Sequence, residues 1–175
     1  MDQFNAERIF GLLRCLNGEL SKLGSSRRTI VVVGGSSLAL MGLRESTSDV
    51  DVISKIDADF EIAIGYVSVA ENLSLKWLNS SAGAFVPQDF DNSRCSLFAN
   101  LSNLRILLIQ PDDLFIMKLF ASRGARDFVD LVALWPICSF ENTAMAIKRY
   151  WTAYPAAYPD EFLEEFVKRI ADLAI

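Results

Sequence analysis

The chain has 175 residues, 51% of them hydrophobic, which is enough for one domain with a packed core and argues against disorder. Its net charge of -5 argues against a general nucleic-acid surface, because affinity for a phosphate backbone needs clustered lysine and arginine. The absence of histidine excludes Ser-His-Asp hydrolysis, and with only three scattered cysteines it also argues against a zinc site.

Hydrophobic periodicity in the first half of the chain predicts helices that alternate with strands. Apolar residues recur at helical spacing over 2–23, and Gly24 follows as a stop signal. The run 29–33 is β-branched and uniformly apolar, as in a strand covered on both faces. The elements predicted in this half are a helix over 2–23, a strand over 29–33, a short helix over 36–41, a strand over 49–53 and a helix over 57–73.

The second half of the chain is predicted to end in helices. Gly83, Pro87 and several Asn and Asp residues interrupt regular structure over 79–103, apart from one candidate strand. Pro111 suits the first turn of a helix, where no backbone N–H donor is needed. The predicted elements are strands over 96–101 and 104–109 and helices over 111–122, 125–135, 142–151 and 160–174.

These elements predict a single α/β (α+β) domain over residues 1–175. A small mixed β-sheet flanked by helices occupies about 25–110, and a helical part follows over about 111–175. The longest apolar run, 29–43, is too short to span a membrane and is interrupted by glycines and serines. Because the N-terminus also lacks the features of a secretory signal, we expect a cytoplasmic protein without membrane contact.

Gly34, Gly35 and Ser36 directly follow the first predicted strand and are a candidate phosphate-binding turn. Backbone N–H groups and a hydroxyl at the start of a helix can bind a phosphate, and at a glycine no Cβ obstructs its approach. The turn matches neither the G-x-G-x-x-G fingerprint nor the Walker motif with its lysine. A purely structural strand-to-helix turn is the alternative interpretation.

Asp49 and Asp51 are a candidate site for Mg²⁺ or Mn²⁺. In a strand, residues i and i+2 point to the same face, so both carboxylates share one face while Val50 and Val52 point to the other. Two like charges held this close repel each other, and a hard divalent cation removes that repulsion. The alternative interpretation is a solvated strand start.

The spacing between the glycine turn and the acidic pair resembles a known signature. The Gly-Gly-Ser turn, twelve further residues and then Asp49-Val50-Asp51 resemble the DNA polymerase β-type nucleotidyltransferase superfamily. The segment 44–51 is similar to the bacterial branch that contains AbiEii-type toxins of toxin-antitoxin systems. The resemblance implies a nucleotidyltransferase fold in which Ser36 binds the triphosphate and the two aspartates hold the metals.

A later stretch resembles a second motif of the same branch. Asp113 stands five residues before Lys118, and Arg126-Asp127-Phe128-Val129-Asp130 follows. The resemblance marks Lys118 and Asp127 as catalytic candidates; on electrostatic grounds, the Lys118 ammonium can contact the triphosphate oxygens, and Asp127 or Asp130 can orient it through a charge-assisted hydrogen bond. Lys118 and Asp127 are therefore expected to line the same cleft as the acidic pair.

Arg123 and Arg126 are further candidates for nucleotide binding, because guanidinium groups bind phosphate with forked donors. The alternative for Lys118 is a solvated lysine, and acidic residues near a helix start also complement the helix dipole. Because Lys118 is expected at a surface position of a helix, replacing it with alanine is predicted to leave folding nearly intact.

One feature departs from the superfamily pattern. A third carboxylate, which usually acts as the base toward the acceptor hydroxyl, is missing from the predicted strand 104–109. Asp89 and Asp91 are the nearest substitutes, and they lie in a stretch with no recognisable motif. The general base is therefore Asp89, Asp91 or absent.

The function expected from these residues is transfer of a nucleotidyl group from a nucleoside triphosphate to an acceptor. The acceptor is left open as a tRNA end, a protein hydroxyl or a small molecule. The alternative is an inactive nucleotide- and metal-binding module that acts through a protein partner, as one half of a toxin-antitoxin pair, and a homodimer is also left open. A Rossmann-type dinucleotide enzyme is disfavoured by the missing third glycine.

Overall fold

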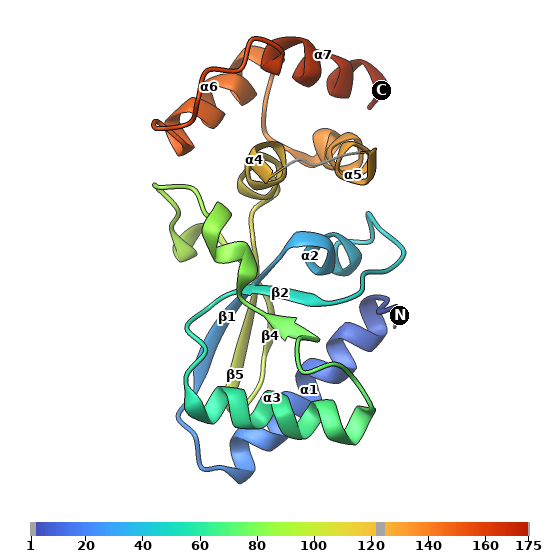
Figure 1. The fold of residues 1–175 in the computed structure, drawn as a ribbon, viewed down its shortest axis with the longest axis vertical. Coiled ribbons are helices and arrows are strands. Elements are labelled where there is room, and N and C mark those ends of the chain that lie inside the picture. Colours follow the sequence, from blue (N-terminus) through green and yellow to red (C-terminus); the bar gives the residue numbers. More distant parts are fainter. Residues whose placement is uncertain (1–2, 122–124, 175) are drawn as a thin grey trace. The chain divides into compact units, whose positions relative to one another are not determined.

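The computed structural model describes residues 3–121 and 125–174 of the chain (Figure 1). Within them the predicted mixed α/β class is confirmed, with a five-stranded mixed sheet and seven α-helices. The chain forms two compact units. The sheet unit contains the residues up to Ala84 and Arg94–Ile109, and the helical unit contains Phe85–Ser93 and the residues from Gln110 onward.

The strands of the sheet unit are β1 (Arg28–Val33), β2 (Val50–Ile53), β3 (Leu78–Asn79), β4 (Ser96–Asn100) and β5 (Leu104–Leu108). Their order across the sheet is β3-β2-β1-β5-β4. The apolar β1 is central, antiparallel to β2 and parallel to β5, as expected for a strand covered on both sides. A β-bulge shifts the register of β4 between Leu97 and Ala99.

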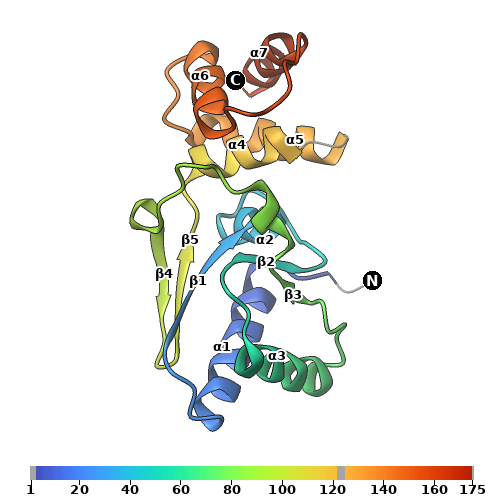
Figure 2. The same cartoon turned by 60° about the vertical axis from the view of Figure 1, so that its left-hand side comes forward.

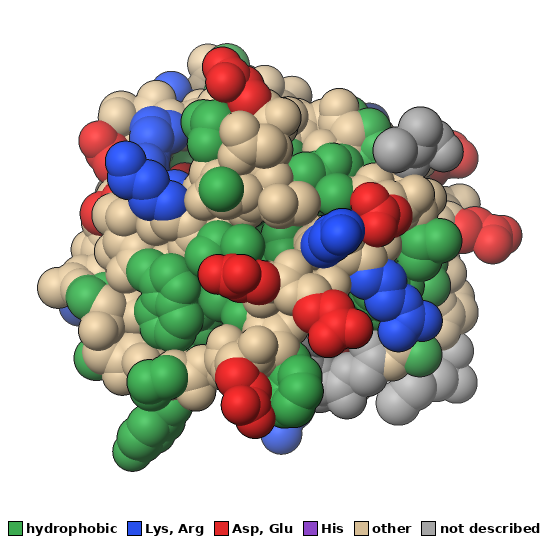
Figure 3. Space-filling model, turned by 90° about the horizontal axis from the view of Figure 1, so that it is seen from above, with side chains coloured by type: hydrophobic (Ala, Val, Ile, Leu, Met, Phe, Trp, Pro, Cys, Tyr) green, Lys and Arg blue, Asp and Glu red, His purple; other side chains and the backbone are tan. Residues whose placement is uncertain are grey.

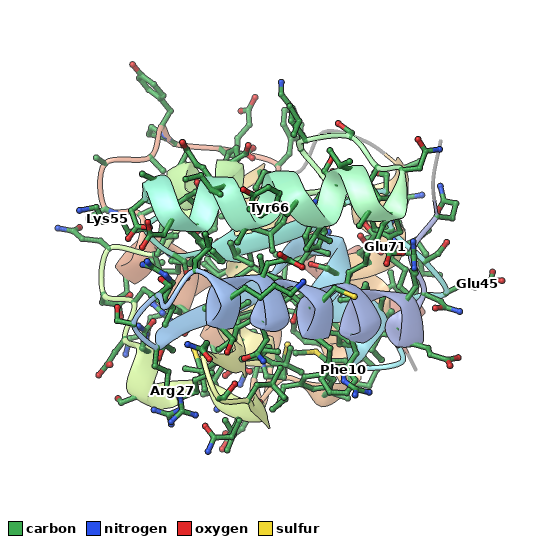
Figure 4. The ribbon with its side chains drawn as sticks, turned by 90° about the horizontal axis from the view of Figure 1, so that it is seen from below. Phe10, Arg27, Glu45, Lys55, Tyr66 and Glu71 are labelled. Carbon is green, nitrogen blue, oxygen red and sulfur yellow. The ribbon has the colours of Figure 1, made fainter. Side chains whose placement is uncertain are left out.

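Helices α1 (Ala6–Lys22) and α3 (Ala58–Glu71) lie side by side against one face of the sheet (Figures 2 and 4). Their apolar faces pack on alternate strand residues and form the core of this unit. Fully buried members of that core include Ile9, Leu13, Ile30, Phe60 and Ile106.

The start of α1 corrects the predicted helix over 2–23. The side chain of Asn5 accepts a hydrogen bond from the Arg8 N–H, so it caps the helix, which begins at Ala6. Phe4 is instead held by paired backbone hydrogen bonds with Thr47, of 2.7 and 3.0 Å. The apolar Phe4 is therefore buried by the loop before β2 and not by continuing the helix.

The third helix of the sheet unit is α2 (Gly34–Leu40). The helical unit contains α4 (Pro111–Ala121), α5 (Ala125–Leu134), α6 (Thr143–Ala153) and α7 (Leu163–Leu173). Short 3₁₀ turns lie at Ser81–Phe85, Asn92–Arg94 and Trp135–Ile137. Helix α4 begins at Pro111 as predicted, and its predicted end at Ser122 lies outside the described residues. No helix of the described ranges combines the length and apolar character needed to cross a membrane.

Aromatic side chains form the centre of the helical unit. The rings of Phe120 and Tyr154 are stacked with centroids 4.0 Å apart, and Tyr150 packs edge-on against Tyr154. The Tyr154 hydroxyl donates a 2.5 Å hydrogen bond to the Phe85 carbonyl, and burial raises the pKa of that hydroxyl. On the face shown in Figure 3, lysine and arginine side chains are scattered among acidic and apolar ones, without forming a basic surface.

Candidate functional site

The glycine turn and the acidic strand are neighbours in the sheet unit. Val33, the last residue of β1, is paired with Asp51 in the antiparallel register of β1 and β2. Gly34 follows with a positive φ of 63°, and a Cβ placed there would lie 2.5 Å from Asp51 Oδ2. Both the backbone conformation and the close carboxylate therefore require glycine. The predicted meeting of the turn and the acidic strand at one end of a mixed sheet is confirmed (Figure 2).

Gly35 makes room for a second pair of side chains, which the sequence reasoning did not single out. A Cβ at Gly35 would lie 2.7 Å from Thr47 Oγ1 and 2.9 Å from Arg44 Nη1. The Nε of Arg44 donates a 2.8 Å hydrogen bond to the Ser46 carbonyl, which anchors the guanidinium on the turn. The sequence signal for this contact was the second of two adjacent glycines, a position where the backbone can be approached closely.

Ser36 is fully buried in the first turn of α2. Its Oγ donates a 2.8 Å hydrogen bond to the Val33 carbonyl, so the hydroxyl proton is engaged with the end of β1. This bond fixes the strand-to-helix turn. Binding of a triphosphate by Ser36 stays a prediction.

The two carboxylates of the candidate metal site line one cavity. Asp49 lies just before β2, and its hydrogen-bond donors among the described residues are neutral: the Thr47 and Ser48 hydroxyls, both at 3.5 Å, and the Asn79 amide at 3.4 Å. These are long contacts that leave its charge uncompensated. Among the described residues, no group of three or more acidic, cysteine or histidine side chains is placed to hold a metal.

The cavity has a volume of about 900 Å³ and lies where β2, β3 and α3 meet. Beside the two aspartates, its wall includes two lysines, Lys55 and Lys76, and one glutamate, Glu61. Figure 4 shows Lys55 beyond the N-terminal end of α3. The remaining lining residues are small polar and apolar: Ser54, Ile56, Ile64, Leu75, Leu78, Asn79, Ser80 and Ser81. The sequence reasoning missed the lysines, because nothing in the local pattern placed them beside the acidic pair.

Lys118 is enclosed by acidic partners in the helical unit. Its ammonium lies 2.7 Å from Asp130 Oδ2 and 3.5 Å from Asp127 Oδ1, so the two carboxylates on α5 bracket it. The Lys118 side chain is only 11% exposed and that of Asp130 7%. The expectation of a surface position for Lys118 is therefore wrong. Its place in a cleft with the acidic pair stays a prediction.

Two of the predicted nucleotide-binding residues cannot be placed in the site. Arg123 lies outside the described residues, as does the side chain of Arg126. Their predicted contacts with a nucleotide rest on the sequence resemblance alone.

The two candidates for the general base are engaged in local structure within the helical unit. Arg149 donates to both oxygens of Asp89, at 3.0 and 3.1 Å, and to the buried Asp113 at 2.6 Å. Burial lowers the pKa of Arg149, but the two carboxylates outweigh it and raise that pKa above its ordinary value. Asp91 accepts the Ser93 N–H at 2.8 Å and its hydroxyl at 2.7 Å, which closes a turn.

Comparison with known families gave one finding. A family model described as a nucleotidyltransferase of unknown function (DUF6036) matches residues 11–144, which include the glycine turn, the acidic pair, α4 and α5. The match supports the nucleotidyltransferase resemblance and does not single out the AbiEii-type branch. The searches of curated proteins and of solved structures each found no match.

Proposed function

The chain belongs to this nucleotidyltransferase family, and on that premise we propose that it transfers a nucleotidyl group from a nucleoside triphosphate to an acceptor hydroxyl. Asp49 and Asp51 are the proposed ligands of Mg²⁺ or Mn²⁺. The observation that supports the proposal most is the close approach of Gly34 to Asp51, where a Cβ would fall 2.5 Å from the carboxylate. A phosphate on the glycine turn and a cation on the aspartates would then be in direct contact.

The donor set suits a hard divalent cation. Both aspartates supply carboxylate oxygens, and the amide of Asn79 lies beside Asp49. Such a cation, when bound, neutralises charge on the reacting phosphoryl oxygens. The neutral hydrogen-bond donors around Asp49 hold its carboxylate in place without cancelling its charge.

We assign the triphosphate to the side of the acidic pair that carries the glycine turn. Arg44 supplies a cation there, since its guanidinium packs on Gly35 and is anchored by the Ser46 carbonyl. A guanidinium held in this way binds phosphate oxygens through forked donors with little further loss of side-chain entropy. The nucleotide-binding roles of Lys118, Arg123 and Arg126 remain proposals based on the sequence resemblance.

The second candidate function is a nucleotide- and metal-binding module without transferase activity, acting through a protein partner. Two observations favour it: among the described residues no third carboxylate is placed to share a metal with Asp49 and Asp51, and both Asp89 and Asp91 are engaged elsewhere. A role as one half of a toxin-antitoxin pair belongs to this proposal as well as to the first.

The test of nucleotide binding is calorimetric titration of each nucleoside triphosphate with Mg²⁺ into the parent and into the variant Asp49→Asn with Asp51→Asn. Loss of both charges is expected to weaken binding at least about 100-fold. A matched variant, Glu164→Gln with Glu165→Gln on the exposed side of α7, removes the same charge elsewhere and is expected to bind like the parent. Equal binding by the aspartate variant would show that the site assignment is wrong.

The test of transfer uses α-labelled triphosphates, Mg²⁺ or Mn²⁺ and a total cell extract, followed by separation of protein, RNA and small molecules. Label in one fraction, lost in the Asp49→Asn with Asp51→Asn variant, supports the enzyme. Binding of the triphosphate without label in any fraction supports the binding module.

A further inference from the structure

The acidic pair of the sheet unit has two different sides. The sheet order β3-β2-β1 puts the glycine turn, which follows β1, on one side of β2 and the edge strand β3 on the other. The cavity of about 900 Å³ is lined by Leu78 and Asn79 of β3 and continues to α3, so it extends from the acidic pair away from the turn. We infer that this cavity receives the acceptor and selects one that carries a phosphate group.

The inference rests on the proposed function and on the geometry of phosphoryl chemistry. The acceptor oxygen forms a bond to the α-phosphorus while the bond from that phosphorus to the bridging oxygen breaks. Pyrophosphate leaves, and the hydroxyl proton passes to water. Because attacking and leaving oxygens are roughly in line, the acceptor and the pyrophosphate lie on opposite sides of the reacting phosphorus. A triphosphate on the turn side, beside Arg44, therefore leaves the β3 side to the acceptor.

The charge of the cavity wall favours an anionic acceptor. Apart from the acidic pair, its ionisable groups are Lys55, Lys76 and Glu61. Once a divalent cation offsets the two aspartates, two positive charges face one negative charge. Within the described residues neither lysine lies within 4.0 Å of a carboxylate, so neither ammonium is held in a close ion pair, although Lys55 is near enough to Asp57 to help lower the pKa of that carboxyl. A polycationic acceptor would meet repulsion here.

The size and lining of the cavity suit a nucleotide unit. A volume of about 900 Å³ lies within the usual range for pockets that enclose a small organic ligand. Asn79, Ser80 and Ser81 give the lining polar groups, while Ile56 and Leu75 offer apolar surface to a base or sugar. The shared ligand chemistry is a hydroxyl-bearing nucleotide, which exists both as a free nucleotide and as the terminal nucleotide of an RNA.

The experiment measures acceptor binding with the donor position already filled. The protein is saturated with Mg²⁺ and a non-hydrolysable triphosphate analogue, and 5′-AMP, a ten-nucleotide RNA with a free 3′-hydroxyl and adenosine are then titrated by calorimetry. At least one phosphate-bearing probe is expected to bind at least about 10-fold more tightly than adenosine. Binding of AMP identifies a free nucleotide as the source, and binding of the RNA alone identifies an RNA end.

The variants Lys55→Gln and Lys76→Gln are expected to weaken that binding about 5- to 10-fold each while leaving the affinity for the analogue unchanged. Lys22→Gln, which removes an exposed lysine of α1 paired with Glu19, is the matched control and is expected to have no effect. A loss of analogue affinity in the two cavity variants would assign the lysines to the donor and overturn the inference. Equal binding of adenosine and the phosphate-bearing probes, or no binding of any, would also overturn it. Failure of the parent to bind the analogue at all would instead count against the proposed function.

Discussion

Asp49 in the sheet unit and Asp130 in the helical unit are aspartates in opposite electrostatic situations. Asp130 is almost fully buried and lies 2.7 Å from the Lys118 ammonium. Asp49 is partly exposed beside a large cavity, and it accepts hydrogen bonds from hydroxyls and an amide at 3.4 to 3.5 Å. The charge of Asp130 is compensated by the fold itself, whereas the charge of Asp49 has no ion-pair partner within the ranges that the structure describes.

This difference separates charges that stabilise the protein from charges that are available for chemistry. A buried charge that loses its partner is costly to the folded state, because it stays desolvated without compensation. A solvated carboxylate beside another carboxylate contributes little to stability and gains most from a bound cation. Substitutions in the two regions should therefore change different measured quantities.

The largest effect on stability is expected for Lys118→Met in the helical unit. Loss of the ammonium leaves Asp130 and Asp127 without this partner in a site where the lysine side chain is only 11% exposed. The free energy of unfolding, measured by urea denaturation, should fall by about 3 kcal/mol. The matched change Lys22→Met, at a lysine side chain 72% exposed, should alter it by less than about 1 kcal/mol. Equal effects of the two changes would contradict the contrast between the regions.

A smaller effect is expected at the glycine turn of the sheet unit. Gly34→Ala introduces a Cβ at a positive φ and within 2.5 Å of Asp51 Oδ2, so the carboxylate must shift. Gly42→Ala is the control, because φ there is 76° and no heavy atom lies within 4 Å of the new Cβ. The control should cost about 1–2 kcal/mol of unfolding free energy for the backbone alone. Gly34→Ala should lower the unfolding free energy by more than the control and should also weaken magnesium binding. An unchanged magnesium affinity would show that Asp51 is not a ligand of the metal.

The smallest effect is expected for a partly exposed charge at the start of α3. Burial raises the pKa of Asp57, but the Phe60 N–H, the Arg28 guanidinium and Lys55 together lower it below its ordinary value of 3.8. Because the pKa is lower in the folded protein, the stabilisation is present above pH 3.8 and is lost as the pH falls through the folded value. Asp57→Ala should slightly lower the melting temperature at pH 7, and the difference should shrink as the pH falls below 3.8. A difference that stays constant with pH would exclude this cap and ion pair as its cause.

The sequence predicted the elements whose signals are local. The strand predicted over 29–33 appears as β1, and the helix predicted over 57–73 appears as α3, which ends at Glu71 because Asn72 adopts a left-handed conformation. The two-residue strand β3 was missed. Its residues have no strand pattern of their own, and only their pairing with Val50 and Asp51 defines them.

In the candidate site, too, the sequence predicted the features that depend on local signals and missed those that depend on tertiary packing. The glycine turn and the acidic pair are adjacent because strand alternation and a short connection bring them together, and both are local properties. Arg44 and Lys76 could not be placed from the sequence, since their positions depend on the conformation of a loop and on the packing of β3. The sequence correctly predicted that Lys118 lies on a helix but wrongly predicted that its side chain is exposed. The apolar residues of α4 are spread around the helix, so their periodicity barely distinguishes a buried face from an exposed one.

The parallel pairing of β1 with β5 has a consequence for folding. Arg28 is aligned with Leu104 and Val32 with Leu108, so the centre of the sheet joins segments about 76 positions apart. Contacts at such separations carry a large loop-closure cost and slow the folding of a domain. During synthesis, one edge of the apolar β1 stays unpaired until Leu108 has emerged, and that edge is the place where association between nascent chains would begin.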